Sequence, residues 1–290
     1  MYLKQRKQRM KSLNLVKKIV KMGLNYIQSF FVFFARMIGI IDFPVPFNSS
    51  MRKTSSCSIR HYYISGIRTY MPIATRAIQE SIMLHDKINI LDFGCGVGRQ
   101  LLHFTRHYQS PCYYACDIDD TSVAFIAKNY PLVQTYVNTY FPPLKYKDRF
   151  FDMIYSVSIF SHLNMEDQKV WLTEFGRITK RGGFCFITTE GYSSLKSLAA
   201  SFSENEKNLK KKLDDFGYIY HEYKDWEETI KNQNSLRVTS SLVGIERSYG
   251  NTVMSPSYIR ESWVGYAFDV IDVVEGIIDH RQDMVVLRRK

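Results

Sequence analysis

Cysteine is scarce in this sequence, and its spacing excludes two classes of small stabilised domain. Only five cysteines occur in 290 residues, at irregular intervals and without a CxxC pair. Neither a disulfide framework nor a cysteine zinc site is therefore indicated, and a reducing, cytoplasmic compartment is expected. Hydrophobic residues make up 45% of the chain and charged residues 23%, so a sizeable globular core is expected.

Acidic residues are absent from the first 41 positions, which carry nine Lys and Arg residues. The other 30 basic residues stand against all 28 acidic residues in positions 42–290, so the body of the chain is nearly neutral. Residues 42–290 therefore carry no large excess of positive charge that could bind the phosphate backbone of a nucleic acid. A nucleic-acid partner is therefore disfavoured.

A long unbroken hydrophobic run is also missing. Apolar side chains recur at helical spacing in residues 15–41, but Arg36 interrupts the most apolar stretch, SFFVFFARMIGII. The unbroken part is too short to span a bilayer, and no small-residue cleavage site suggests a secretory signal. Residues 1–41 are predicted to form a basic amphipathic arm. Such an arm is suited to binding an anionic membrane surface, here the inner face of a membrane. The alternative is that it packs against protein.

Glycine is sparse, yet three of the 15 glycines stand within five positions, at Gly94, Gly96 and Gly98. They follow a predicted buried strand, residues 87–93, and precede a predicted helix. Strand, glycine turn and helix form the first unit of a doubly wound sheet, with backbone N–H groups at a helix N-terminus. Arg99 stands where the GxGxxG dinucleotide pattern needs its last glycine, and the Walker pattern is absent, so neither nucleotide motif is present.

The segment 92–98, DFGCGVG, resembles the cofactor loop of class I S-adenosylmethionine (SAM) dependent methyltransferases. Other segments resemble that family in the same order along the chain. Asp117 follows Gly98 by 19 residues at the end of a predicted strand, SVSIFSHL occupies 156–163 and RGGFCFITT occupies 181–189. The resemblance covers about residues 88–190, and SVSIFSHL is similar to the SVFTHL signature of a type 11/12-like subgroup.

This resemblance implies an α/β fold: a Rossmann-like, doubly wound, seven-stranded sheet with an antiparallel last strand, preceded by the N-terminal amphipathic helix. Residues 42–86 are expected to form a helical segment over the cofactor. Residues 87–290 are expected to form the methyltransferase domain. Within that domain, about residues 192–254 are expected to form an insertion on the substrate side.

The resemblance also implies SAM as cofactor and no metal. Asp92 would hold the amino group of the cofactor, directly or through water, and Asp117 would accept both ribose hydroxyls. Asn138 and Thr139 are expected to contact the adenine. The other cofactor-binding candidates lie in the glycine loop, beside Asp117 or after the fourth strand: Gly94, Cys95, Gly96, Gly98, Ile118, Ser156 and Ser158.

The implied activity is methyl transfer to a small-molecule, sugar or lipid-linked acceptor, more on oxygen than on other atoms. His162, Glu190 and His221 are candidates for a general base. For His162 the alternative is packing below the pocket, and Glu190 stands where the subgroup more often has histidine. An RNA or protein methyltransferase and a non-catalytic SAM-binding scaffold at a membrane stay open. DNA amino methylation is disfavoured, because the sequence after the fourth strand reads SVSIF rather than [D/N/S]-P-P-[Y/F/W].

Substitution Gly96→Val should abolish cofactor binding and leave the fold nearly intact, because the added side chain occupies space where a ligand lies against the backbone. Calorimetric titration with S-adenosylhomocysteine measures the binding, and circular dichroism monitors the fold. A folded variant that still binds the cofactor product would contradict the assignment.

Overall fold

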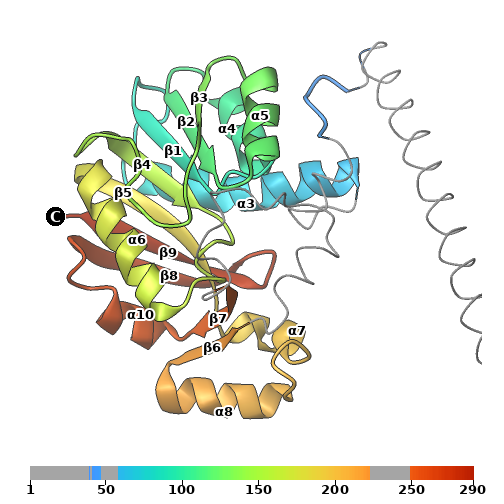
Figure 1. The fold of residues 1–290 in the computed structure, drawn as a ribbon, viewed down its shortest axis with the longest axis vertical. Helices are drawn as coiled ribbons and strands as arrows, with labels where there is room; N and C mark the ends of the chain where they lie inside the picture. Colours follow the sequence, from blue (N-terminus) through green and yellow to red (C-terminus); the bar gives the residue numbers. More distant parts are fainter. Residues whose placement is uncertain (1–38, 40, 47–57, 223–248) are drawn as a thin grey trace, which may run out of the picture. The chain divides into compact units, whose positions relative to one another are not determined.

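The computed structural model describes residues 39, 41–46, 58–222 and 249–290 (Figure 1). The predicted amphipathic helix within residues 1–41 lies outside the described residues, as does the middle of the predicted insertion, residues 223–248. Over the part that is described, no helix combines the length and the hydropathy needed to cross a membrane.

The predicted fold class is confirmed by the central sheet. Five parallel strands lie in the order β3-β2-β1-β4-β5, and the last strand of the chain, β9, pairs antiparallel with both β5 and β8. The bounds of these strands are β1 Asn89–Phe93, β2 Cys112–Asp117, β3 Val133–Val137, β4 Phe151–Ser156, β5 Thr179–Glu190, β8 Phe268–Ile278 and β9 Gln282–Arg289. Because the central strands are parallel and buried on both faces, they read as nearly continuous apolar runs.

Helices cover both faces of this sheet (Figure 1). Phe104 of α4 stacks on Tyr155 of β4 on one face, with ring centroids 4.8 Å apart. On the other face Phe93 of β1 packs against Trp171 of α6 at 4.5 Å. The helices of the first face are α3 Ile59–Gln79, α4 Arg99–His107 and α5 Asp120–Asn129; those of the second are α6 Met165–Ile178 and α10 Pro256–Ser262. Ser255 caps α10 by accepting a hydrogen bond from the N–H of Tyr258, as its sequence predicts.

Helix α3 is held close to α4 and to the β8–β9 hairpin. A Cβ atom on Gly66 would lie 2.4 Å from the carbonyl oxygen of Arg99, so only glycine permits this approach. Arg76 pairs with Asp272 of β8 at 2.6 Å, and Arg68 pairs with Asp279 in the hairpin turn at 3.2 Å. These two ion pairs therefore link the helix to the β8–β9 hairpin.

The segment RGG, residues 181–183, lies inside β5. Phe151 pairs with Thr179 and Met153 with Phe184, so residues 180–183 are looped out opposite a single residue of β4. Gly182 takes a left-handed conformation with φ of 74° in this bulge. The RGG segment is thus a bulge within β5, and the pairing of β5 with β4 continues on both sides of it.

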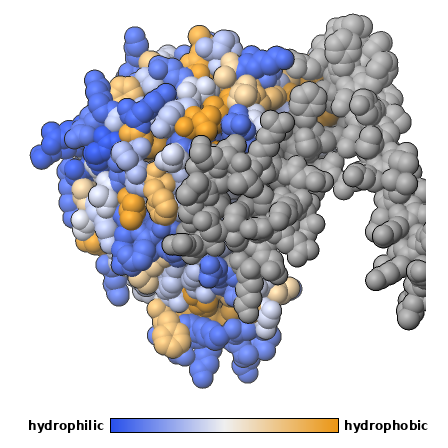
Figure 2. Space-filling view, in the orientation of Figure 1, coloured by the Kyte–Doolittle hydropathy of each residue, from blue (hydrophilic) through white to orange (hydrophobic). Residues whose placement is uncertain are grey.

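The described parts of the insertion form a small unit beside the end of β5 (Figure 1). It has a separate cluster of buried apolar residues, which includes Leu209 and Leu213. Its last strand, β7, meets β5 through a single residue pair, Glu190 with Val253. The elements are η1 Tyr192–Ser194, α7 Leu195–Leu198, α8 Glu206–Phe216, β6 Tyr218–Glu222 and β7 Gly250–Met254. Figure 2 shows mainly polar side chains on the visible surface of the described residues, with hydrophobic ones in small separate groups.

Candidate active site

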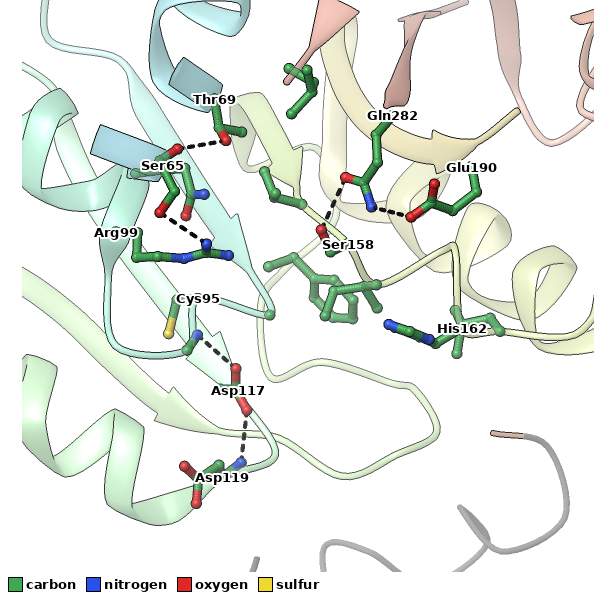
Figure 3. A pocket seen from close by; sticks show the side chains of 18 of the residues that line it. Ser65, Thr69, Cys95, Arg99, Asp117, Asp119, Ser158, His162, Glu190 and Gln282 are labelled. Carbon is green, nitrogen blue, oxygen red and sulfur yellow. Dashed lines mark hydrogen bonds between the residues drawn. The ribbon is translucent and has the colours of Figure 1, made fainter. Parts of the chain in front are cut away.

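A cavity of about 740 Å³ opens at the carboxyl ends of the central strands, where doubly wound proteins bind ligands. Its volume lies within the range of about 300–1,000 Å³ that is typical of small-molecule sites. Nine of the residues proposed from the sequence line it: Gly94, Cys95, Gly96, Asp117, Ile118, Asn138, Ser158, His162 and Glu190. Figure 3 shows the side chains at this site.

The glycine loop needs its three glycines for conformation as well as for access. Gly94, Gly96 and Gly98 have φ of 73°, 49° and 74°, a region that other residues rarely adopt. A Cβ on Gly94 would also lie 2.4 Å from Ile159, and one on Gly98 would lie 2.5 Å from Ile126. Gly98 caps α4 and does not line the cavity. Two of the three glycines are therefore also required by packing within the protein.

Asp117, at the end of β2, binds the glycine loop directly (Figure 3). Its Oδ2 accepts a hydrogen bond from the N–H of Gly96 at 2.8 Å, and its Oδ1 accepts one from the N–H of Asp119 at 2.8 Å. These two bonds tie the glycine loop and the start of the next segment to the end of β2. The sequence assigned Asp117 to the ligand alone, whereas here it also fixes the loop.

Asp92 lies beneath the loop, 2% exposed, and does not line the cavity. Burial raises the pKa of Asp92 to about 8; the negative charge of Asp117 adds to the rise, and the nearby Tyr155 hydroxyl and Arg99 oppose it. Its Oδ2 has no hydrogen-bond partner among the described residues. A buried, unsatisfied carboxyl oxygen beside a ligand cavity is suited to an ammonium group or a bridging water.

Arg99 contributes a cation to the same end of the cavity. Its Nη1 donates a hydrogen bond to Ser65 Oγ of α3 at 3.2 Å, the single hydrogen bond of this side chain within the described residues. Burial lowers the pKa of Arg99, and nearby Tyr62 and Asp92 oppose this effect. A guanidinium with several unused donors facing a cavity is suited to a carboxylate ligand.

At the β3 end of the cavity, the amide of Asn138 is buried and keeps one unpartnered atom. Its Nδ2 donates to the carbonyl oxygen of Thr139 at 2.8 Å, while its Oδ1 has no hydrogen-bond partner in the described residues. Thr139 itself turns away: its hydroxyl donates to the carbonyl oxygen of Phe141 and does not line the cavity. Asn138 is thus the one of the two predicted adenine contacts that faces the ligand space.

Two more of the proposed residues lie away from the cavity. Ser156 is fully buried at the end of β4, below the cavity lining. His221, on β6, packs against Phe202 with ring centroids 5.4 Å apart and is not part of the lining.

His162 follows β4 and faces the opposite end of the cavity from Arg99 (Figure 3). Its Nδ1 lies 2.8 Å from the carbonyl oxygen of Gly250 in β7. A carbonyl only accepts, so Nδ1 carries the proton and Nε2 of the neutral ring carries a lone pair. Burial lowers the pKa of His162, although the Gly250 carbonyl and Glu190 favour its protonated form. Tyr249 stacks on the ring at 5.0 Å.

Glu190, the last residue of β5, is 4% exposed and neighbours His162. Its Oε1 accepts hydrogen bonds from Arg281 Nη2 at 2.9 Å and from Gln282 Nε2 at 3.0 Å. Arg281 Nε lies farther, 3.4 Å from Oε2. The ion pair compensates the buried charge of Glu190.

Several lining residues were not predicted from the sequence as site residues. They come from α3, from the start of α4, from β7 and from the β8–β9 turn: Ser65, Thr69, Arg99, Tyr249, Asn251, Arg281 and Gln282. Arg99 could have been predicted as a site residue, because it directly follows Gly98 of the glycine loop. The others are brought in by tertiary contacts between elements far apart in the sequence, and no local pattern marks them.

Comparison with known proteins agrees with this topology. Residues 91–187 match a family model described as a methyltransferase domain. The PH0226 protein of Pyrococcus horikoshii is 15% identical, with a TM-score of 0.50 over 79% of this chain and 91% of that one. A SAM-dependent methyltransferase of Clostridium acetobutylicum is 11% identical, with a TM-score of 0.49 over 78% and 92%. PKMT2 of Rickettsia typhi, solved with AdoHcy, is 13% identical, with a TM-score of 0.43 over 72% and 50%.

The family match shows that residues 91–187 form a methyltransferase domain, and the order of the strands is that of the Rossmann-like methyltransferase fold. The chain is a SAM-dependent methyltransferase enzyme, and SAM is its cofactor. The site fits that molecule. Arg99 and Asn138 line the cavity with an available guanidinium and an unpartnered amide oxygen, and Asp92, beneath the glycine loop, keeps an unsatisfied carboxyl oxygen among the described residues.

The pKa of Asp92 predicts how the stability of the cofactor-free protein depends on pH. Asp92 is protonated in the folded state up to about pH 8 but ionises near pH 4 when unfolded. Folding therefore retains a proton between these values, and its contribution to stability is lost as pH rises. Relative to Asp92→Asn, the wild-type free energy of unfolding should fall by up to about 1.4 kcal/mol per pH unit between pH 5 and 7.

Urea unfolding of both proteins at several pH values measures this difference. The Asn variant is the matched control, because its amide has the shape of the protonated acid and cannot ionise. Parallel pH curves for the two proteins would show that Asp92 is ionised in the folded protein.

Proposed function

We propose that this enzyme methylates a hydroxyl oxygen of a small, neutral, hydroxyl-bearing acceptor such as a sugar. We call the end of the cavity near His162 the acceptor end. It is lined by groups that exchange hydrogen bonds with hydroxyls: Ser197, Ser201, Tyr249 and Asn251. The charge of Glu190 is compensated by Arg281. Among the described residues, a charged acceptor would therefore meet Glu190 and Arg281 already paired with each other at this end.

The observation that carries the proposal is the tautomer of His162. The Gly250 carbonyl holds the proton on Nδ1, and burial keeps the ring neutral at physiological pH. Nε2 is the nitrogen that we propose takes the proton of a hydroxyl, which is what oxygen methylation requires of a general base. This geometry favours the catalytic interpretation of His162 over a purely structural one.

At the other end, Arg99 is proposed to bind the methionine carboxylate of SAM and Asp92 its amino group. Asp117 and Asn138 are proposed to hold the ribose and the adenine. When bound, SAM supplies a methyl group on a cationic sulfur, and the protein contributes alignment and exclusion of water. The proposals of a lipid-linked acceptor and of binding to an anionic membrane surface depend on residues 1–41, which lie outside the described residues.

The acceptor class is tested by transfer of labelled methyl from SAM into a host extract, fractionated into lipid, glycan, small-molecule, protein and RNA pools. We expect label in the glycan or small-molecule pool. Label in RNA or protein alone would overturn the acceptor class and keep the fold. No label in any pool, with cofactor binding intact, would favour the non-catalytic scaffold.

Substitution His162→Asn is expected to lower kcat by about 10²- to 10⁴-fold, the usual contribution of a general base. The Asn amide nitrogen can replace Nδ1 as donor to Gly250 while Nε2 is lost. Rates are measured on the fraction that the wild type labels. The wild-type rate should rise with pH through a pKa below the ordinary value of about 6.5, and the variant should lack this limb.

The affinity for S-adenosylhomocysteine serves as the control and should change little. A variant without His162 that keeps the wild-type rate and pH profile would remove His162 from the chemistry.

A further inference from the structure

One amide, that of Gln282, joins β9 to β5 and to the loop after β4 at the acceptor end of the cavity (Figure 3). Gln282 begins β9 and is 8% exposed. Its Oε1 accepts hydrogen bonds from Ser158 Oγ and Thr188 Oγ1, each at 3.0 Å. Its Nε2 donates to Glu190 Oε1 at 3.0 Å. The amide therefore links the loop after β4 to the end of β5.

The direction of this amide is fixed by its partners. The hydroxyl oxygen of Thr188 already accepts the N–H of Ser158 at 2.8 Å, so its own proton is directed to Gln282. A flipped amide would also turn its carbonyl oxygen towards the carboxylate of Glu190, where two acceptors repel. Only one orientation satisfies all of these groups.

This orientation determines which oxygen of Glu190 a ligand can use. Oε1 accepts from both Gln282 and Arg281, whereas Oε2 has only the longer contact of 3.4 Å with Arg281 Nε. Glu190 lines the cavity at the same end as His162. Oε2 is consequently the oxygen of Glu190 that can accept a hydrogen bond from a ligand hydroxyl. That hydroxyl would lie next to the ligand hydroxyl that faces His162.

The same amide also supports a strained loop. Ser158 has φ of 59°, a left-handed conformation that is unfavourable for serine. Its N–H and its hydroxyl are both bonded within this network, to Thr188 and to Gln282. The next residue, Ile159, lies against Gly94 of the glycine loop. The network thus spans the acceptor end and reaches the cofactor loop.

We propose that Gln282 is a positioning residue that holds Glu190 so that its Oε2 binds a second hydroxyl of the acceptor. This inference rests on the proposed function, and it narrows the acceptor to molecules with at least two hydroxyl groups near one another. Gln282 acts through Glu190, with no contact to the reacting atoms. The β8–β9 turn thereby takes part in acceptor recognition.

The test uses Gln282→Leu in the full-length protein, with the labelled extract fraction as acceptor probe. We expect the KM for that fraction to rise about tenfold, the loss of roughly one good hydrogen bond. The Kd for S-adenosylhomocysteine should stay within about twofold. The double variant Glu190→Gln with Gln282→Glu again places a hydrogen-bond donor opposite an acceptor. It should recover part of the kcat/KM that Gln282→Leu loses.

Gln168→Leu is the matched control for loop damage. Gln168 is also a buried amide, and it anchors the same loop through the carbonyls of Phe160 and Leu163 at 3.1 and 3.0 Å, but it does not line the cavity. Both leucine variants should lose thermal stability. Only Gln282→Leu should raise the KM for the acceptor out of proportion to that loss. An equal rise in both variants would overturn the proposal.

A second readout needs no acceptor. Glu190→Gln should lower the pKa of His162, followed by NMR of labelled histidine, because a neighbouring negative charge is removed. This change should persist in the Gln168→Leu background and shrink in the Gln282→Leu background, where Glu190 is no longer held. An undiminished change would overturn the positioning role. If no extract fraction is labelled, the proposed function fails while this titration still decides the role of Gln282.

Discussion

The turn from β1 into α4 is the constraint on which the rest of the site depends. Three left-handed residues in five positions reverse the chain, and only glycine takes that conformation without strain. Gly94 and Gly98 also leave room for isoleucines of the β4 loop and α5. The turn is then tied to β2 by Asp117. The cofactor end of the cavity therefore takes its shape from the same residues that join the first two strands of the sheet.

Charge is distributed unevenly between the two ends of the cavity. The cofactor end has Asp92 and Arg99, a carboxyl and a guanidinium whose capacity for hydrogen bonds is not filled by protein. Unsatisfied buried groups are costly, and a ligand with both an amino and a carboxylate group can satisfy the two together. At the acceptor end, Glu190 already forms an ion pair with Arg281 and accepts a hydrogen bond from Gln282. The first arrangement suits an amino acid moiety, and the second suits a neutral polar molecule.

The acceptor end depends on segments outside the five parallel strands of the sheet. Strand β7 of the insertion supplies the carbonyl of Gly250 that fixes the tautomer of His162, and its neighbour Tyr249 stacks on the ring. The β8–β9 turn supplies Arg281 and Gln282 to Glu190. Variable segments at the carboxyl edge of a common sheet are the usual source of substrate choice in such folds.

The sequence by itself determined the fold class, the succession of the first five strands along the chain and the cofactor, and most of the cofactor-binding residues proposed from it line the cavity. These follow from local patterns, because a buried strand, a glycine turn and an acid at a strand end are each readable within a few residues. The RGG bulge and the turned-away Thr139 were not predicted, since register and side-chain direction depend on neighbouring strands. The acceptor end was decided only by tertiary structure. Gln282 and Glu190 are 92 residues apart, and His162 and Gly250 are 88 apart. No sequence period records contacts at such separations; they exist only once the sheet has brought these strand ends to one edge.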